Sequence, residues 1–554
     1  MAARSQRPPA RRSLARQDQA DRQCRDTLCL VQATRIFFRP LWTHSSESRL
    51  LSRRRCNSAK IVVRFCAIQE RGVMPSWKEN DFRRGFQVLI PTHTERLLPY
   101  LFLLALLCIA VAFRPLLPVD ETRYLSVTWE MYLSGHVFVP TMNFAPYLQK
   151  PPLLFWLIDL VWSIFGASRV AAMLVIFAAS SLVIWLTTLL ARTLFPERDD
   201  IVRRIPWLVA GSTVFVIYST LILFDMLLTA FVLAALLSLL AFAKSGNRWQ
   251  AVLAGLFIGL GVLTKGPVVL IHIGAPVLLY PFWRDRRVEL APLKFFSGAG
   301  LAILAALIPV AVWLAPATIL TKGNFVYDLV WSQSAGRVTG NLHNSHGRPF
   351  YFYLLLLPVM FMPWVFIPEV WRLKLRTRIR SLIDTKSPDL RALRLLSFSL
   401  VAVLLVFSAI YGKQPHYMMP ALPFATILFG YFMAEIPLAR FRNTAFVMLA
   451  IFGIGHAVAS ATAFKRYDLM PLANFIDERK DADWAVAFDY QGEVGFLARL
   501  EKPFEQVDNP QEWLQSHPGG YVIDKTSGDP GASEQVAFRL PVERGYLVVL
   551  KGQH

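Results

Sequence analysis

The uncharged stretch MLLTAFVLAALLSLLAFA, residues Met226–Ala243, decides the class of this protein. It lies between Asp225 and Lys244 and is nearly as long as the roughly 20 residues that a helix needs to cross a hydrocarbon core of about 30 Å. Similar runs recur along the chain, which has 554 residues, 54% hydrophobic content, a mean hydropathy of +0.40 and only 18% charged residues. Because this composition is too apolar for one soluble domain, we expect a polytopic α-helical membrane protein.

Ten further apolar runs are long enough, or nearly so, to span a bilayer, which makes about 11 expected spans. The runs are Leu97–Phe113, Ser168–Leu190, Ile205–Phe224, Gln250–Leu263, Val268–Trp283, Lys294–Ala317, Phe350–Trp371, Arg394–Ile410, His416–Ala434 and Asn443–Phe464. One more run, Pro152–Phe165, is short and bounded by prolines and a Phe-Gly pair. We interpret it as a half-inserted helix.

The basic residues support this assignment, because short cytoplasmic loops of membrane proteins are enriched in Lys and Arg. With 11 spans and a cytoplasmic N-terminus, the inner loops contain Arg192–Arg204, Lys244–Arg248, Arg284–Arg287, Arg372–Arg394 and Arg440–Arg442. The net charge of +21 therefore reflects topology, and we expect no nucleic acid partner. If Pro152–Phe165 were a full span, the basic 192–204 and 372–394 loops would both move outside.

The N-terminal residues 1–73 differ from the rest of the chain. They are rich in arginine, contain four of the five cysteines and show no sustained helical or strand period. A transit peptide or a metal site is possible in such a segment, but the cysteine spacing does not fit a zinc knuckle. We expect this segment to be disordered, or not translated because synthesis starts at Met74. Residues 74–96 then form a basic cytoplasmic lead-in to the first span.

The C-terminal residues 465–554 are polar and alternate strand-like with helix-like segments. Strands are expected in Trp484–Phe488, Gly520–Ile523 and Gly545–Leu550, and helices in Leu472–Arg479 and Gln511–Gln515. This pattern predicts a small α/β domain on the outer, periplasmic side. We expect it to assist access of a substrate without supplying chemistry. Residues 97–464 form the transmembrane domain, and 114–167 its first outer loop.

Charged residues in the outer loops need an explanation other than topology. The cations are Arg114, Arg123, Lys150, Lys265, Lys322, Arg337, Arg348 and Lys413. Those at span ends either meet a lipid phosphate or snorkel to the interface. Two acids, Asp120 and Glu121, begin an amphipathic stretch, and Asp225 stands alone between two apolar runs. An ionisable residue at such a place indicates function. Asp120 has the alternative role of a helix N-cap.

Six motifs, in order, resemble those of the protein O-mannosyltransferase superfamily of C-type glycosyltransferases (GT-C). They are Asp120-Glu-Thr-Arg-Tyr124, Tyr147-Leu-Gln-Lys-Pro-Pro152 with Trp156 and Phe165-Gly166, Asp225-Met-Leu-Leu-Thr229, Thr264-Lys-Gly-Pro267, His346-Gly-Arg-Pro-Phe350, and Gly412-Lys413 with Tyr417 and Pro420. The chain is most similar to the bacterial branch that includes the lipid A aminoarabinose transferase. The resemblance extends from about Leu97 to Phe464.

The resemblance implies an inner-membrane enzyme that takes a sugar from a polyprenyl-phosphate carrier, typically undecaprenyl phosphate, and transfers it to a lipid, glycan or protein acceptor at the outer face. An inverting transfer needs a carboxylate that removes the proton of the attacking hydroxyl, and Asp120 occupies that position, with Glu121 or Asp225 assisting. The leaving phosphate needs cationic partners. The candidates are Arg123, Lys150, Lys265 and Lys413, with Tyr147 and Tyr417 as neutral donors.

Two positions depart from the aminoarabinose transferases. Gln149 stands where those enzymes have a glutamate that can contact a metal, and the later loop Trp331–Arg337 lacks their acidic and histidine residues. A divalent metal is therefore uncertain. His343 and His346 are candidate ligands, alone or with Asp120, although a Gly/Asn-rich loop also favours solvated histidines.

Two other classes of function remain open at this stage. A transporter or flippase of polyprenyl-linked sugars would place charges along a membrane-crossing cavity, ideally in repeated halves. The acids inside the apolar runs are few, and we detect no internal repeat. A scaffold whose C-terminal domain binds envelope proteins is the third hypothesis.

Overall fold

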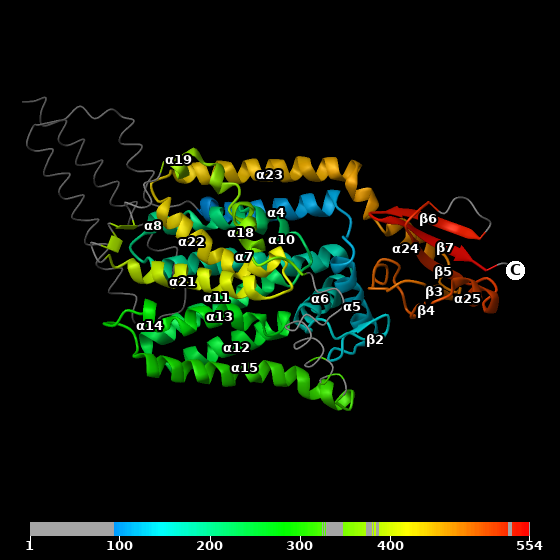
Figure 1. The fold of residues 1–554 in the computed structure, drawn as a ribbon, viewed down its shortest axis with the longest axis horizontal. Helices are drawn as coiled ribbons and strands as arrows, with labels where there is room; N and C mark the ends of the chain where they lie inside the picture. The colour runs from blue at the N-terminus through cyan, green and yellow to red at the C-terminus, as the bar shows by residue number, and fades with distance from the viewer. Residues whose placement is uncertain are drawn as a thin grey trace, which may run out of the picture. The chain divides into compact units, whose positions relative to one another are not determined.

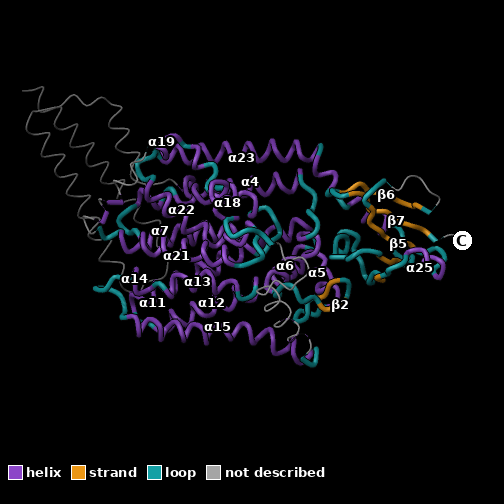
Figure 2. Tube along the Cα trace, viewed as in Figure 1, coloured by secondary structure: helices purple, strands orange, loops and turns teal. Residues whose placement is uncertain are grey.

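The computed structural model describes residues 93–323, 325, 327, 329, 347–372, 379, 380, 382, 383, 387–529 and 535–552. The expectations for residues 1–73 and for almost all of the lead-in 74–96 concern residues outside these ranges. The described chain is mostly helical, and its long helices lie side by side (Figure 1). Most strands lie in its C-terminal part, and one short hairpin lies near helix α5 (Asp120–Ser134), as the orange segments of Figure 2 show.

Six helices of the described ranges are long and apolar enough to cross a membrane. They are α4 (His93–Phe113), α7 (Arg169–Leu194), α11 (Asp225–Ser245), α15 (Pro292–Leu320), α21 (Leu390–Ala409) and α23 (Leu438–Ala461). Helix α12 (Arg248–Lys265) packs against both α11 and α15. These helices confirm a polytopic helical membrane fold, while the number of 11 spans stays a prediction.

Two of the runs expected as spans, 205–224 and 350–371, do not form one continuous helix each. The first divides into α9 (Ile205–Ala210) and α10 (Thr213–Tyr218), the second into α18 (Phe352–Met360), η2 (Trp364–Phe366) and α19 (Pro368–Trp371). The two breaks meet, since the Thr213 amide donates to the Met362 carbonyl at 3.0 Å and Trp364 Nε1 donates to Ser212 Oγ at 3.0 Å. In an apolar medium a helix can break only where tertiary partners satisfy the freed backbone groups.

Two further expected spans begin or end irregularly. Residues 268–283 form α13 (Val268–Leu278) and α14 (Tyr280–Trp283), and residues 416–434 form the 3₁₀ helix η3 (Pro415–Ala421) and α22 (Leu422–Phe432). Prolines within these segments remove the amide that a continuing helix would need. The short helix α8 (Asp199–Val202) precedes α9, and η4 (Ala463–Arg466) follows α23.

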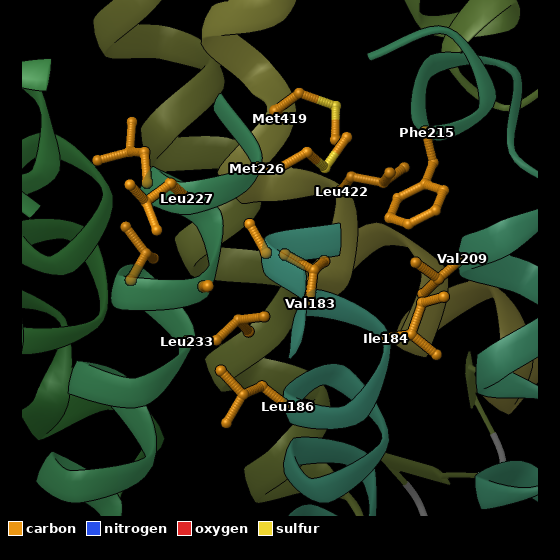
Figure 3. Packing of buried hydrophobic residues seen from close by; sticks show 14 of the residues in the cluster. Val183, Ile184, Leu186, Val209, Phe215, Met226, Leu227, Leu233, Met419 and Leu422 are labelled. Atoms are coloured by element: carbon orange, nitrogen blue, oxygen red, sulfur yellow. The ribbon is translucent and has the colours of Figure 1, made fainter. Parts of the chain in front are cut away.

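Side chains of several helices interdigitate in one large apolar core. Figure 3 shows Val183, Ile184 and Leu186 of α7 near Val209 of α9, Phe215 of α10, Leu233 of α11 and Leu422 of α22. Met226 and Leu227, at the start of α11, lie in the same cluster. This packing fixes the end of α11 at which Asp225 lies.

Residues 114–167, expected as the first outer loop, contain two helices and a hairpin. Helix α5 (Asp120–Ser134) packs against α6 (Leu153–Phe165), and strands β1 (Thr141–Met142) and β2 (Ala145–Pro146) lie between them in sequence. Helix α6 begins and ends close to the limits expected for the half-inserted helix. Whether it enters the membrane stays a prediction.

The C-terminal residues form a five-stranded sheet in the order β4-β3-β5-β7-β6. Its elements are α24 (Met470–Asp477), β3 (Trp484–Val486), β4 (Glu505–Gln506), α25 (Pro510–Ser516), β5 (Tyr521–Thr526), β6 (Val536–Val542) and β7 (Gly545–Lys551). Strand β3 is parallel to β4 and β5, and the other pairs are antiparallel. The sequence missed β6, an edge strand in which Arg539 and Pro541 interrupt the apolar pattern.

Candidate functional site

The buried pair of Arg114 and Glu121 organises the start of the 114–167 segment. The two side chains are 4% and 2% exposed and form a bidentate ion pair. Glu121 also accepts hydrogen bonds from the amides of Leu117 at 3.0 Å and Ile222 at 2.9 Å. Glu121 therefore joins the turn before α5 to the loop before α11, and its oxygens are occupied by four donors.

Asp120, the neighbour of Glu121, has a contrasting environment. It is exposed and is the first residue of α5, where the helix dipole favours a negative charge. The N-cap is Val119, which provides no side-chain cap, so the alternative role of Asp120 as N-cap was wrong. The Tyr124 hydroxyl donates to Asp120 Oδ1 at 3.1 Å. Burial and the charge of Asp120 raise the pKa of Tyr124 well above its usual value, so this donor keeps its proton.

A hairpin turn holds the segment that carries Lys150 against α5. Asn143 and Phe144 have φ angles of 53° and 60°, as in the two-residue turns that match strand twist. Their amides donate to the two carboxylate oxygens of Glu130 on α5, at 2.7 and 2.8 Å. Because Glu130 is only 5% exposed, this attachment is part of the folded core.

The segment after the hairpin places Tyr147, Gln149 and Lys150 beside α5. Arg123 Nη1 donates to Gln149 Oε1 at 2.7 Å. The buried Tyr147 packs its ring on Phe155 of α6 and interacts electrostatically with Tyr124. Gln149, which replaces the glutamate of the aminoarabinose transferases, therefore acts here as an acceptor for an arginine.

Asp225 and Lys265 form a second buried ion pair, between the start of α11 and the end of α12. Lys265 Nζ lies 2.6 Å from Asp225 Oδ1, and the side chains are 9% and 3% exposed. The ammonium also lies 5.1 Å from the ring centroid of Tyr417, within cation–π range. The sequence placed these three residues in separate motifs, and the structure brings them together.

His416 interacts both with Asp120 and Lys150 of the 114–167 segment and with the Asp225–Lys265 ion pair. Its ring contacts those of Tyr218 and Tyr417, with centroids 5.7 and 4.9 Å apart. It interacts electrostatically with four of the predicted residues, which are Lys265, Asp225, Lys150 and Asp120. Lys150 also interacts with Asp225. Sequence reasoning treated His416 only as the start of a span, although its place in Gly412–Pro420, one of the six motifs, was a signal that could have identified it.

Lys413 is positioned differently from the other cations. It is 3% exposed, and its ammonium donates to the backbone carbonyls of Arg348, at 2.9 Å, and of Ile410. These contacts tie the loop before α18 to the end of α21, next to the bridge between Gly347 and Gly412. The ammonium of Lys413 is thus engaged by backbone carbonyls, and its predicted phosphate contact stays a prediction.

The metal hypothesis rests on residues outside the described ranges. His343 and His346 lie in the 330–346 segment, of which nothing is described. Within the described ranges, no three His, Cys, Asp or Glu side chains gather as metal ligands would.

The C-terminal domain binds directly to α5. Ser126 Oγ donates to the Gly492 carbonyl and accepts from the Phe496 amide, both at 2.8 Å, and Trp129 Nε1 donates to the Leu500 carbonyl at 2.9 Å. Gly495 approaches so closely that a Cβ there would lie 2.8 Å from Ser126 Oγ. Helix α5, which begins with Asp120, is thus held in place by residues 492–500 of the C-terminal part of the chain.

A cavity of about 240 Å³ borders the two residues before Asp120. Pro118 and Val119 line it on one side, and Glu493, Lys525 and Arg544 of the C-terminal domain are among its charged residues. Asp120 therefore directly follows two residues that line a cavity with both apolar and charged side chains.

Comparisons with known proteins show which proteins this chain is similar to. A family model described as dolichyl-phosphate-mannose-protein mannosyltransferase matches residues 149–313, which include Lys150, Asp225 and Lys265. The undecaprenyl phosphate-alpha-4-amino-4-deoxy-L-arabinose arabinosyl transferase of Pseudomonas aeruginosa strain UCBPP-PA14 is 29% identical over 57% of this chain and 55% of its own length. The Erwinia tasmaniensis protein of the same name is 27% identical over 64% and 62%.

The chain thus spans little more than half the length of the curated relatives it matches. Among solved structures, ArnT from Cupriavidus metallidurans bound to undecaprenyl phosphate has a TM-score of 0.63 at 16% identity, covering 83% of this chain and 98% of that one. At this identity the likeness shows a common fold.

Proposed function

We propose, from the membership of this chain in the protein O-mannosyltransferase superfamily of C-type glycosyltransferases, that it transfers a sugar from a polyprenyl phosphate to an acceptor. The membership confirms the resemblance found in the six motifs. The observation that carries the proposal is the group of Asp120, Lys150, Asp225 and Lys265 around His416. A carboxylate that can act as a base and cations suited to a phosphate leaving group thus all act electrostatically on one histidine, which supports the proposal.

In the proposed reaction, Asp120 accepts the proton of the acceptor hydroxyl while the oxygen of that hydroxyl attacks the anomeric carbon of the donor sugar. The bond from that carbon to the phosphate oxygen breaks, and the phosphate leaves with the bonding electrons. The Tyr124 hydroxyl, which donates to Asp120 Oδ1, orients the carboxylate. Attack from the face opposite the phosphate would invert the anomeric carbon.

The leaving phosphate would be bound by Lys150, with Arg123 oriented beside it by Gln149. Lys265 contributes less free charge, because Asp225 already neutralises it. Asp225 therefore positions Lys265 and does not act as a second base. Tyr147 and Tyr417 complete the proposed phosphate site as neutral groups. Glu121, engaged by four donors, and Lys413, engaged by carbonyls, are structural in this proposal.

The donor is proposed to be a sugar on undecaprenyl phosphate, as the names of the relatives indicate. The proposed acceptor is lipid A, which follows from the resemblance of the six motifs to the lipid A aminoarabinose transferase. The acceptor would approach Asp120 through the cavity beside Pro118 and Val119. We place the protein in the bacterial inner membrane with its N-terminus in the cytoplasm and its C-terminal domain in the periplasm. Alkaline phosphatase fused to the C-terminus should then be active. A flippase is not favoured, since the relatives are named as transferases.

The decisive experiment is transfer in proteoliposomes with an undecaprenyl-phosphate-linked sugar and lipid A. Asp120→Asn should lower the rate about 10²–10⁴-fold, the usual contribution of a general base. Asp159→Asn on α6 is the matched control, since it removes a nearby acid outside the His416 group. The assignment of Asp120 as base fails if Asp120→Asn retains full activity. The configuration of the product, read by NMR coupling constants, tests inversion separately.

A further inference from the structure

A second cavity, which we call the seam cavity, lies where the C-terminal domain meets the ends of α4, α7 and α23. Its volume is about 600 Å³. Its lining comprises residues 112–116, 168–169, 460, 464–465, 468–470, 496–497 and 499. None of the described residues grouped around His416 lines it, so it is separate from the proposed transfer site.

Four cations line the seam cavity, and three of them have donors without partners. The cations are Arg114, Arg169, Arg499 and Lys465. Within the described ranges, Arg114 Nε, Arg169 Nε and Arg499 Nη1 are buried and have no acceptor in hydrogen-bond reach. Buried polar groups are normally paired, so each of these donors calls for an acceptor.

Other nitrogens of these arginines make hydrogen bonds or ion pairs that hold the side chains in place. Arg169 Nη1 donates to the Arg114 carbonyl at 2.5 Å, and Arg499 Nη2 donates to the Ala167 carbonyl at 2.7 Å. Arg114 is fixed by its pair with Glu121. Glu121 compensates the charge of Arg114. The acid among the described lining residues, Asp468, accepts from the Met470 amide at 3.0 Å and compensates one of the other three charges. The cavity is therefore a preformed cationic site.

The walls of the seam cavity are apolar and continue onto lipid-facing helices. Phe113 and Met470 line it and are each 41% exposed, and Phe464 and Leu497 add apolar surface. Only 6% of the apolar stretch of α23 is buried. In a membrane protein such an exposed face contacts acyl chains. A ligand that satisfies both surfaces carries a negative head group on an apolar chain.

We propose that the seam cavity binds an anionic lipid through the phosphate of its head group, with the acyl chains along α4 and α23. Phosphate supplies the several acceptor oxygens that guanidinium groups bind best. Bilayer phospholipid and the phosphorylated acceptor lipid share this chemistry. Arg114 holds Glu121, and Arg499 lies 4.7 Å from the ring centroid of Trp129 on α5. The lipid would thus contact the same arginines that hold the helix of Asp120.

The test is photo-crosslinking of full-length protein in phosphatidylcholine nanodiscs that contain a photoactivatable phosphatidylglycerol. We expect crosslinks in peptides that cover 112–116 and 464–470. Unlabelled phosphatidylglycerol or lipid A should compete, and whichever competes better identifies the source of the phosphate. Crosslinks found only elsewhere, or equal competition by phosphatidylcholine, would overturn the proposal. Equal competition by inorganic phosphate would refute a lipid as the ligand.

Lys465→Gln provides the matched variant, because Lys465 is exposed and its replacement should leave the fold intact. Removing one cation near a membrane surface should weaken competition by the anionic lipid about fivefold. Lys502→Gln, an exposed lysine of the same domain outside the seam cavity, should leave it unchanged. Equal effects of the two variants would show that the lipid responds to surface charge in general, and would overturn the assigned site.

Discussion

Replacing Lys265 by Met should reduce the free energy of unfolding by about 3–5 kcal/mol, because it leaves Asp225 as a buried charge without its partner. The side chains are 9% and 3% exposed and lie 2.6 Å apart, so the rule for buried pairs applies. A surface pair would contribute only about 0–1 kcal/mol. Asp225→Asn should cost a similar amount, since it isolates the Lys265 ammonium.

The double variant Asp225→Asn/Lys265→Met should recover much of this loss, because neither charge remains. Its cost should be well below the sum of the single costs, with a coupling of about 0.5–3 kcal/mol as expected for residues in contact. Transfer activity should stay low in the double variant, since the cation beside the leaving phosphate is still missing. Recovery of stability without recovery of activity would separate the two roles of Lys265.

Unfolding can be followed by tryptophan fluorescence in mixed micelles with a rising fraction of denaturing detergent. Lys244→Met is the matched control, because Lys244 is exposed at the opposite end of α11 from Asp225 and should change stability by less than about 0.5 kcal/mol. Additive single costs in the double variant would refute the reasoning, since they would show that the two side chains do not interact.

Three further predictions concern α5. Tyr124→Phe should lower the transfer rate less than Asp120→Asn, because it removes only the hydrogen bond that orients the base, and the two rates in proteoliposomes check this order. Glu121→Gln should destabilise the fold by about 3–5 kcal/mol, measured in the same micelles, while activity per folded molecule changes little. Gly495→Ala should cost about 1–3 kcal/mol by forcing a Cβ against Ser126, visible as faster hydrogen exchange of α5. Gly528→Ala, where nothing lies within 4 Å of the added Cβ, should leave that exchange unchanged.

Local sequence predicted the long apolar helices. The long uncharged run of α11 needs no tertiary partner to be recognised, because the length and polarity of one segment decide whether it can enter hydrocarbon. The breaks at Gly211 and Phe361 were missed for the opposite reason. Each is stabilised by the other, through Thr213, Ser212 and Trp364, and pairs of segments 150 residues apart leave no local pattern.

For the candidate site, too, the sequence predicted some features and the tertiary structure decided others. Residue type and motif order by themselves identified Asp120, Lys150, Asp225 and Lys265, because the proposed chemistry requires acids and cations at an outer surface. Only the tertiary structure distinguished Asp120 from Glu121. The two are adjacent in sequence, yet the Ile222 amide and Arg114 enclose one and leave the other exposed. Such partners come from distant helices, and the free energy of a buried charge depends on those partners, so sequence position alone could not assign the roles.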